Sequence, residues 1–157
     1  MRIGLLAVGR LKSGPILALF EDYVRRLRWP FAMTEVEERR RLASAALKDR
    51  EGELLLSGLE TMSRKSTSPM VIALDERGTA FTSTAFAQRL GSWRDQGLDP
   101  LFIIGGAEGL VPPVLDRAGL ILALGPMTWP HLVVRVLLVE QLYRAQSILE
   151  GHPYHRE

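Results

Sequence analysis

The sequence predicts an α/β fold with an open, mostly parallel sheet and helices on both faces. Short apolar segments alternate along the chain with longer amphipathic segments, and most of the short segments are apolar at consecutive positions. Strands of this kind are buried on both sides, as in parallel sheets that are covered by helices. The chain has 157 residues, the length of one domain, so we expect a single domain over residues 1–157.

The chain begins with a predicted strand and a predicted helix. Residues 2–8 (RIGLLAV) are almost continuously apolar, which indicates a buried strand. Ser13 is the expected cap of a helix that begins near Pro15, because proline is favoured in the first turn of a helix. This helix is expected to stop before the Trp-Pro pair at 29–30.

A second strand, a second helix and a third strand follow. Residues 31–37 (FAMTEVE) alternate between apolar and polar, which is typical of an edge or half-exposed strand. Leucines recur at helical spacing over residues 42–63 and predict a long helix. A polar linker at 63–68 leads to a buried strand at 70–74 (MVIAL), and residues 75–78 (DERG) have the composition of a turn that ends it.

The second half of the chain repeats this alternation. A helix is predicted over residues 82–96, with the hydroxyl of Thr82 or Ser83 as its cap. Buried strands are predicted at 101–104 (LFII) and 120–124 (LILAL), and each is followed directly by glycine.

Composition excludes several classes of protein. The chain has no cysteine, which excludes disulfides, thiolate zinc sites, iron–sulfur clusters and a catalytic thiol. His152 and His155 have no third ligand nearby, so we expect no metal site. No apolar run approaches the ~18 residues of a membrane span, and the apolar start is too short for a signal peptide. We therefore expect a cytoplasmic protein that does not act at a membrane.

The basic residues are concentrated in the first part of the chain. The net charge of +2 is too small for an indiscriminate nucleic-acid binder. Residues 1–65 nevertheless carry 13 Lys and Arg against 9 Asp and Glu. Arginines cluster at Arg25, Arg26, Arg28 and residues 39–41. Contact with an RNA backbone and simple solvation of helix faces explain these clusters equally well.

Three segments at the ends of predicted strands are candidates for a ligand site. They are residues 74–78, 104–109 and 124–131, and each joins an apolar strand to glycine or proline. In an open α/β sheet, ligands bind beyond the carboxyl ends of the strands. A pocket built mostly from main chain suits an adenine ring with a small polar tail. The glycines at 105–109 predict a tight turn rather than a dinucleotide fingerprint, and no phosphate-binding P-loop motif occurs.

The predicted last helix, over residues 131–149, is apolar on nearly every face in its first half. Burial on all sides would then require a second subunit or a chain segment wrapped over it. Arg135 is expected either to pair with a carboxylate or to face a pocket, whereas Glu140 and Arg144 form an ordinary i,i+4 pair. At the N-terminus of this helix, His131 is expected to act as a cap rather than to face a ligand.

The last seven residues (GHPYHRE, 151–157) have an unusual composition for a chain end. His152 and His155 can move protons, as can the phenol of Tyr154, and these rings can stack on a base. A tail that is simply docked, with Tyr154 buried, is the alternative.

Five segments together resemble one known family over essentially the whole chain. They are AVGRLKSG (7–14), ALDERG (73–78), FIIGGAEGL (102–110), MTWPHLVVRVLLVEQLYRA (127–145) and GHPYHRE (151–157). This set is similar to the RlmH family of SPOUT-class methyltransferases. The resemblance implies a C-terminal deep trefoil knot, a homodimer, S-adenosyl-L-methionine as methyl donor, no metal, and methylation of N3 of a pseudouridine in the helix 69 loop of 23S ribosomal RNA, on assembled 70S ribosomes.

The resemblance also implies which residues hold the methyl donor. They fall at the three strand ends, on Leu74, Gly105, Gly106, Leu124, Gly125, Pro126, Met127, Thr128 and Trp129. Two positions depart from the family pattern. Gly125 stands where members commonly have serine, and Trp129 stands where they have phenylalanine or leucine.

The catalytic candidates are His131, Arg135, Tyr154 and His155. Methylation of a nitrogen that carries a proton needs a base, and His131 or His155 can supply one, with the tail slightly favoured. Arg135 is expected to stabilise an anionic base or grip phosphate, and Tyr154 and His155 to complete the pocket of the other subunit. The alternatives are a non-catalytic ribosome-binding protein of the same fold, and a SPOUT methyltransferase acting on the ribose 2′-oxygen of transfer RNA.

Overall fold

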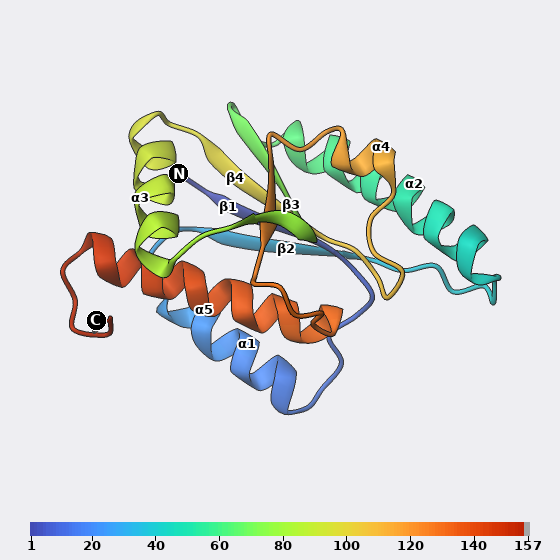
Figure 1. Cartoon of the computed structure of the whole chain (residues 1–157), viewed down its shortest axis with the longest axis horizontal. Coiled ribbons are helices and arrows are strands. Elements are labelled where there is room, and N and C mark those ends of the chain that lie inside the picture. Colours follow the sequence, from blue (N-terminus) through green and yellow to red (C-terminus); the bar gives the residue numbers. More distant parts are fainter. Residues whose placement is uncertain (156–157) are drawn as a thin grey trace.

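Five parallel strands form one sheet, and helices cover both of its faces (Figure 1). The computed structural model describes residues 1–155. The strands are β1 (Ile3–Val8), β2 (Phe31–Val36), β3 (Pro69–Ala80), β4 (Asp99–Ile104) and β5 (Leu120–Ala123), in the order β2-β1-β4-β3-β5. The helices are α1 (Pro15–Arg26), α2 (Ser44–Ser63), α3 (Ser83–Asp95), α4 (Pro112–Leu115) and α5 (His131–Leu149). The α/β class and the edge position of β2 are confirmed.

Each face of the sheet has its own hydrophobic core. Along β1, the side chains of Ile3 and Leu5 pack into the core beneath α1, α3 and α5, whereas Leu6 and Val8 pack into the core beneath α2 and α4. This alternation is the two-residue period of a strand. Because every residue from Leu5 to Val8 is buried, β1 reads in the sequence as one continuous apolar run.

Helix α5 lies between α1 and α3 on one face of the sheet (Figure 1). Leu138 and Leu142 are completely buried there, while Val133 and Leu137 are only half-buried. The expectation that a second subunit or a further chain segment covers α5 stays a prediction. The trefoil knot stays a prediction as well.

The predicted turn at residues 75–78 is wrong, because β3 continues through it to Ala80. Leu74 and Thr79 both pair with Leu122 of β5, so the four residues between them form a bulge. Gly78 is needed at this bulge, since a Cβ there would lie 2.5 Å from the carbonyl oxygen of Ile121. A charged, glycine-containing bulge has the same composition as a turn, which explains the error.

The helix caps are partly as predicted. The Thr82 hydroxyl accepts a hydrogen bond from the backbone N–H of Ala85 at 3.1 Å, which confirms Thr82 as the cap of α3. The prediction for Ser13 is wrong, because α1 begins after Gly14 without a side-chain cap. The short helix α4 was not predicted, since its four residues include two prolines at the first two positions. No helix within residues 1–155 is long and apolar enough to span a membrane.

Candidate active site

A cavity of about 410 Å³ opens at the carboxyl ends of β4 and β5, beside the bulge of β3. This volume lies within the range of pockets that bind small molecules and cofactors. The three loops singled out in the sequence form most of its wall, and the start of α5 and one residue of α2 close it. The lining residues are Lys48, Leu74, Asp75, Glu76, Arg77, Ile104, Gly105, Gly106, Ala107, Glu108, Gly109, Leu110, Leu122, Leu124, Gly125, Met127, Thr128, Trp129, His131 and Val134.

The structure brings together nearly all the residues predicted to hold the methyl donor. Each of them lines the cavity except Pro126. Sequence reasoning missed Lys48 and Val134, which reach the cavity from helices. The end of a strand can be predicted from a run of apolar residues. Which side chain of a distant helix points toward that strand end depends on tertiary packing, which no local sequence pattern reveals.

Two glycines in the cavity wall have different structural roles. A Cβ on Gly106 would lie 2.5 Å from a carboxylate oxygen of Glu51, so any larger residue here would have to displace the Glu51 side chain. Gly125 has φ +100°, a left-handed conformation that L side chains rarely adopt. The serine that the resemblance leads us to expect at this position would be strained in this backbone conformation.

Charged groups line one side of the cavity. The Arg77 guanidinium hydrogen-bonds to the Asp75 carboxylate at 2.8 Å and thereby holds the pKa of Asp75 below its usual value. The Thr128 hydroxyl donates to the Glu76 carboxylate at 2.7 Å, which ties the bulge of β3 to the loop after β5. Lys48 contributes a cation from α2. Two of the three ligand loops are thus joined by a hydrogen bond between side chains.

A second pair of carboxylates lies at the loop after β4. Burial raises the pKa of Glu51, and the nearby negative charge of Glu108 raises it further. Glu108 itself lines the cavity. Carboxylates therefore outnumber cations in and around the cavity wall, which favours a ligand that carries positive charge.

His131 lies at the cavity rim as the first residue of α5. The expectation that it caps the helix is wrong, because Pro130 holds the cap position and the cap has no side-chain hydrogen bond. The other side of the imidazole meets the loop after β1, where Nε2 lies 3.4 Å from the position of a Cβ on Gly9. Burial, and then the positive charge of Arg135, lower the pKa of His131 from 6.5. The imidazole is therefore neutral at pH 7.

Arg135 does not line the cavity. Its side chain is 0% exposed and forms an ion pair with Glu35 of β2, with Nη1 and Oε1 2.6 Å apart. The other terminal nitrogen donates to the carbonyl oxygens of Val8 and Gly9 at the end of β1. Of the two expectations for Arg135, pairing with a carboxylate is the one that is confirmed. The side chain fastens the ends of β1 and β2 to α5, one helical turn from His131.

The tail folds back over the second half of α5. The Tyr154 phenol donates to Glu140 at 3.1 Å and lies 3.2 Å from the Tyr23 hydroxyl. The Arg144 guanidinium lies over the Tyr154 ring and pairs with Glu140 at 2.6 Å, which confirms the predicted Glu140–Arg144 pair. Burial and these hydrogen bonds raise the pKa of Tyr154, so it stays a neutral phenol. The imidazole nitrogens of His155 are buried and have no hydrogen-bond partner within residues 1–155.

One chain therefore separates the catalytic candidates into two groups. His131 lies at the N-terminal end of α5, and Tyr154 and His155 follow its C-terminal end. The tail folds back along α5 as far as Glu140, nine residues from His131 and about 14 Å away along the helix. Neither Tyr154 nor His155 lines the cavity of its own chain.

Comparison with known proteins identifies the family. The family model described as "Predicted SPOUT methyltransferase" matches residues 1–155. A protein named Ribosomal RNA large subunit methyltransferase H from Rhodospirillum centenum is 54% identical over 157 residues, which cover 99% of each sequence. The chain belongs to the RlmH family of SPOUT methyltransferases. A second relative of the same name, from Paramagnetospirillum magneticum, is 52% identical with the same coverage.

Membership of the RlmH family makes the chain an enzyme of the methyltransferase class. Solved structures share its fold at low identity. A probable methylase family protein from Haemophilus influenzae has a TM-score of 0.60 at 13% identity, covering 99% of this chain and 70% of that one. The SpoU methyltransferase AviRb from Streptomyces viridochromogenes, solved with AdoMet, has a TM-score of 0.52 at 11% identity, covering 92% and 58%. These likenesses concern the fold alone.

Proposed function

We propose that this protein methylates N3 of a pseudouridine in the helix 69 loop of 23S ribosomal RNA, with S-adenosyl-L-methionine as the methyl donor. The observation that carries the proposal is the cavity between the bulge of β3 and the carboxyl ends of β4 and β5, with a neutral imidazole at its rim. Relatives that match along their whole length are named as large-subunit ribosomal RNA methyltransferases. A ribosomal substrate implies a cytoplasmic enzyme.

The residues of the cavity fit the methyl donor. Leu74, Leu122 and Leu124 offer apolar surface for an adenine ring, and the glycine-rich loop after β4 offers backbone donors and acceptors. The donor carries a sulfonium and an ammonium, and Glu76 and Glu108 supply carboxylates for these cations. When bound, the donor supplies an electrophilic methyl group whose bond to sulfur breaks as the new bond to nitrogen forms.

The protein's own residues position the acceptor and remove its proton. N3 of a neutral base carries a hydrogen, which must leave as the bond between nitrogen and carbon forms. The neutral His131 imidazole at the rim can accept this proton, and His155 from a second subunit is the other candidate. Correct placement of the two reacting groups supplies much of the remaining rate enhancement. Arg135 acts through the loop after β1 and through His131, so we assign it a positioning role.

A homodimer is part of this proposal. Neither Tyr154 nor His155 lines the cavity of its own chain, and Tyr154 packs instead on Glu140, nine residues along α5 from His131. From this docked position, Tyr154 and His155 serve catalysis only if they enter the cavity of a second chain. Apolar surface for such contact lies on α1, where Ile16 is 39% exposed and Leu19 is 48% exposed. The half-buried residues Val133 and Leu137 of α5 add to it.

The test is methylation of defined RNA. Purified protein and labelled donor are incubated with 70S ribosomes from a strain that lacks the corresponding modification, and nucleosides are analysed by mass spectrometry. We expect N3-methylpseudouridine from 23S RNA alone. A ribose 2′-O-methyl product on transfer RNA would instead establish the alternative methyltransferase activity. No product from any RNA, with donor binding intact in calorimetry, would contradict the proposal.

A further inference from the structure

Two loops leave the carboxyl ends of β1 and β2 side by side and carry a high density of positive charge. The backbone N–H of Gly9 donates to the carbonyl of Val36 at 2.8 Å, and the N–H of Leu11 donates to the Glu35 carboxylate at 2.7 Å. These contacts fasten the loop of residues 9–14 to the end of β2, from which residues 37–43 continue. Together the two segments contain five Lys and Arg side chains and two glutamates.

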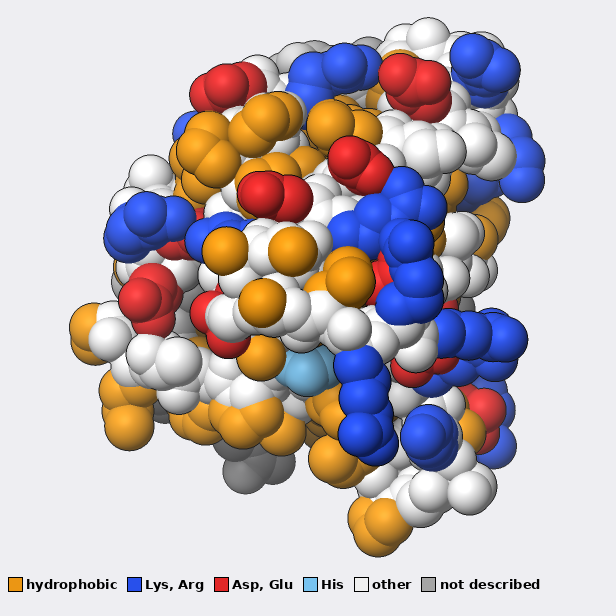
Figure 2. Space-filling model, turned by 90° about the vertical axis from the view of Figure 1, so that its right-hand side faces the viewer, with side chains coloured by type: hydrophobic (Ala, Val, Ile, Leu, Met, Phe, Trp, Pro, Cys, Tyr) orange, Lys and Arg blue, Asp and Glu red, His pale blue; other side chains and the backbone are white. Residues whose placement is uncertain are grey.

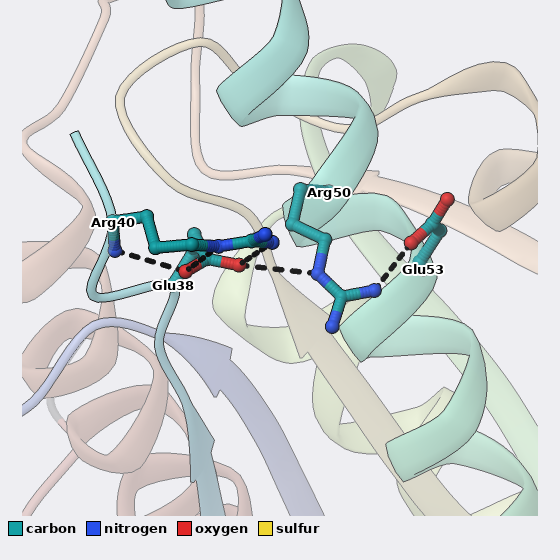
Figure 3. A network of polar contacts seen from close by, with 4 residues as sticks. All are labelled: Glu38, Arg40, Arg50 and Glu53. Carbon is teal, nitrogen blue, oxygen red and sulfur yellow. Dashed lines mark hydrogen bonds and ion pairs between the residues drawn. The ribbon is translucent and has the colours of Figure 1, made fainter. Parts of the chain in front are cut away.

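The carboxylate of Glu38 organises the second of these loops (Figure 3). It is 9% exposed and accepts hydrogen bonds from the backbone and guanidinium of Arg40 at 2.9–3.0 Å. It also accepts from Arg50 of α2 at 3.1 Å, and Arg50 in turn pairs with Glu53. The hydrogen bonds from Arg40 hold the pKa of Glu38 far below its usual value, so the network stays charged at neutral pH. Arg40 and Arg50 are thus committed to holding the loop on α2.

The remaining cations of the two loops face solvent. Lys12, Arg39 and Arg41 are exposed and form no ion pair with any residue in the described range 1–155. Arg10 is 56% exposed and has only a long contact of 3.7 Å with Glu37. We call these four residues, Arg10, Lys12, Arg39 and Arg41, the basic rim. Figure 2 shows a run of Lys and Arg side chains down this side of the molecule, interrupted by a few carboxylates, with a histidine beside it.

The basic rim borders the cavity. Gly9 begins the loop that carries Arg10 and Lys12, and it lies against His131, which lines the cavity on its other side. Helix α2, which holds the Arg39 and Arg41 loop through Arg50, also sends Lys48 into the cavity wall. A polymer that places one unit in the cavity therefore has its neighbouring units next to the rim.

We propose that the basic rim binds the phosphate backbone of the RNA strand whose base enters the cavity. The inference rests on the proposed function for the identity of the RNA, and it assigns the backbone contact to particular residues. Nucleic-acid affinity comes largely from cations that meet phosphates, and such contacts set the register of the chain without reading sequence. The guanidinium fork of Arg suits phosphate, and Arg39 and Arg41 are not occupied by carboxylates within residues 1–155. By contrast, Arg25 and Arg26 share Asp22, and Arg28 pairs with Glu150.

The test compares two pairs of arginines that differ in position alone. One double variant is Arg39→Gln with Arg41→Gln. The matched control is Arg64→Gln with Arg117→Gln, which removes the same charge from two exposed arginines that form no ion pair within residues 1–155. Arg64 lies between α2 and the start of β3, and Arg117 precedes β5, so both lie toward the amino ends of the strands, away from the cavity. Thermal unfolding and the donor's Kd are measured for both variants to show that fold and cavity are intact.

Binding to a labelled RNA hairpin with the helix 69 sequence is measured against salt concentration, beside the KM and kcat for ribosomes. We expect the rim variant to bind roughly tenfold more weakly at low salt, and its salt slope to be shallower by about 1 for each phosphate that is no longer neutralised. Its KM rises while kcat at saturating ribosomes stays within about twofold. The control variant behaves as wild type.

Three results would overturn the inference. The first is that the rim variant binds the hairpin as tightly as wild type does. The second is that hairpin binding is weakened equally in the rim variant and in the control. The third is that the rim variant binds ribosomes more weakly but the hairpin normally, which would indicate an acidic ribosomal protein as the partner. Failure of the proposed function is a different result, namely absence of the methylated nucleoside with wild-type protein. In that case the hairpin titration still tests whether the basic rim binds RNA.

Discussion

The guanidinium of Arg135 holds three segments together from inside the protein. It meets Glu35 of β2 and the carbonyl oxygens of Val8 and Gly9, and it is completely buried. Its two terminal nitrogens have partners that replace the hydrogen bonds of water, whereas Nε is buried without a partner within residues 1–155. The same residue sits one helical turn from His131, so its contacts also set where the rim of the cavity lies.

Arg135→Ala is expected to lower the free energy of unfolding by about 3 kcal/mol, because it leaves Glu35 and two carbonyls without their partner. Glu35 is 23% exposed and regains some water, which keeps the loss at the lower end of the usual range. Urea unfolding measures the change. Arg94→Ala is the control, since its pair with Asp95 is on the surface and is worth only a few tenths of a kcal/mol. A similar loss in both variants would contradict a structural role specific to Arg135.

The lowered pKa of His131 gives a pH dependence with a defined sign. A general base must be neutral, so kcat/KM should fall in acid with an apparent pKa below the 6.5 of a free imidazole. Stability changes in the same direction. The contribution is complete above the unfolded pKa of 6.5 and is lost as pH falls from there to the folded pKa, because the unfolded state binds the proton first.

His131→Gln should remove this acid limb and lower kcat by roughly 10²–10⁴, as a pH series of methyl-transfer rates would show. His155→Gln is the comparison, because the sequence favours the tail slightly as the source of the base. If the acid limb survives in His131→Gln and disappears in His155→Gln, the base is His155 and the assignment of His131 is wrong.

At the scale of elements, the N-terminal caps of α1 and α3 differ, and this difference can be tested by measuring thermal stability. Thr82 caps α3 through its hydroxyl, whereas Ser13 makes no such bond at the start of α1. Thr82→Ala should therefore lower stability by about 1 kcal/mol, a fall in Tm of about 2–4 °C for a chain of this size. Ser13→Ala should change the Tm by less than about 1–2 °C. Equal shifts would mean that the observed caps do not decide helix stability.

The elements most visible in the sequence are those that are buried on both sides. Strands β1 and β4 are continuous apolar runs, and α5 has no polar face in its first half, so these are correctly predicted. The bulge in β3 is invisible because its charges and glycine imitate a turn. Helix α4 begins with two prolines and has four residues, too few to show a helical period.

The same limit applies to the candidate site. Leu74, Gly105 and Trp129 follow strands or flank glycine and proline, and this local pattern predicts the cavity wall. Lys48 is different, because its place in the wall depends on the angle at which α2 crosses the sheet. Arg135 is different again, since the sequence shows a cation in an apolar helix but not the carboxylate 100 residues away that pairs with it.

At the scale of the whole molecule, the two ends of α5 present two halves of one proposed site. The cavity and His131 lie at its beginning, and the tail with Tyr154 and His155 leaves its end and packs along its second half. In a homodimer with two-fold symmetry, each surface meets its counterpart twice, so any tail that enters the other chain's cavity does so in both directions. In a dimer of two different variants, the number of complete sites then depends on which substitution each chain carries.

Mixing two inactive variants tests this arrangement. One carries His131→Gln and the other carries Tyr154→Ala with His155→Ala, and neither homodimer should retain a complete site. Random exchange at equal amounts makes about half of the dimers mixed, each with one complete site, so activity should return to about a quarter of the wild-type value. Methyl-transfer rates before and after subunit exchange measure the recovery. If each tail serves its own chain, every site in the mixed dimer keeps one defect, and the mixture stays inactive.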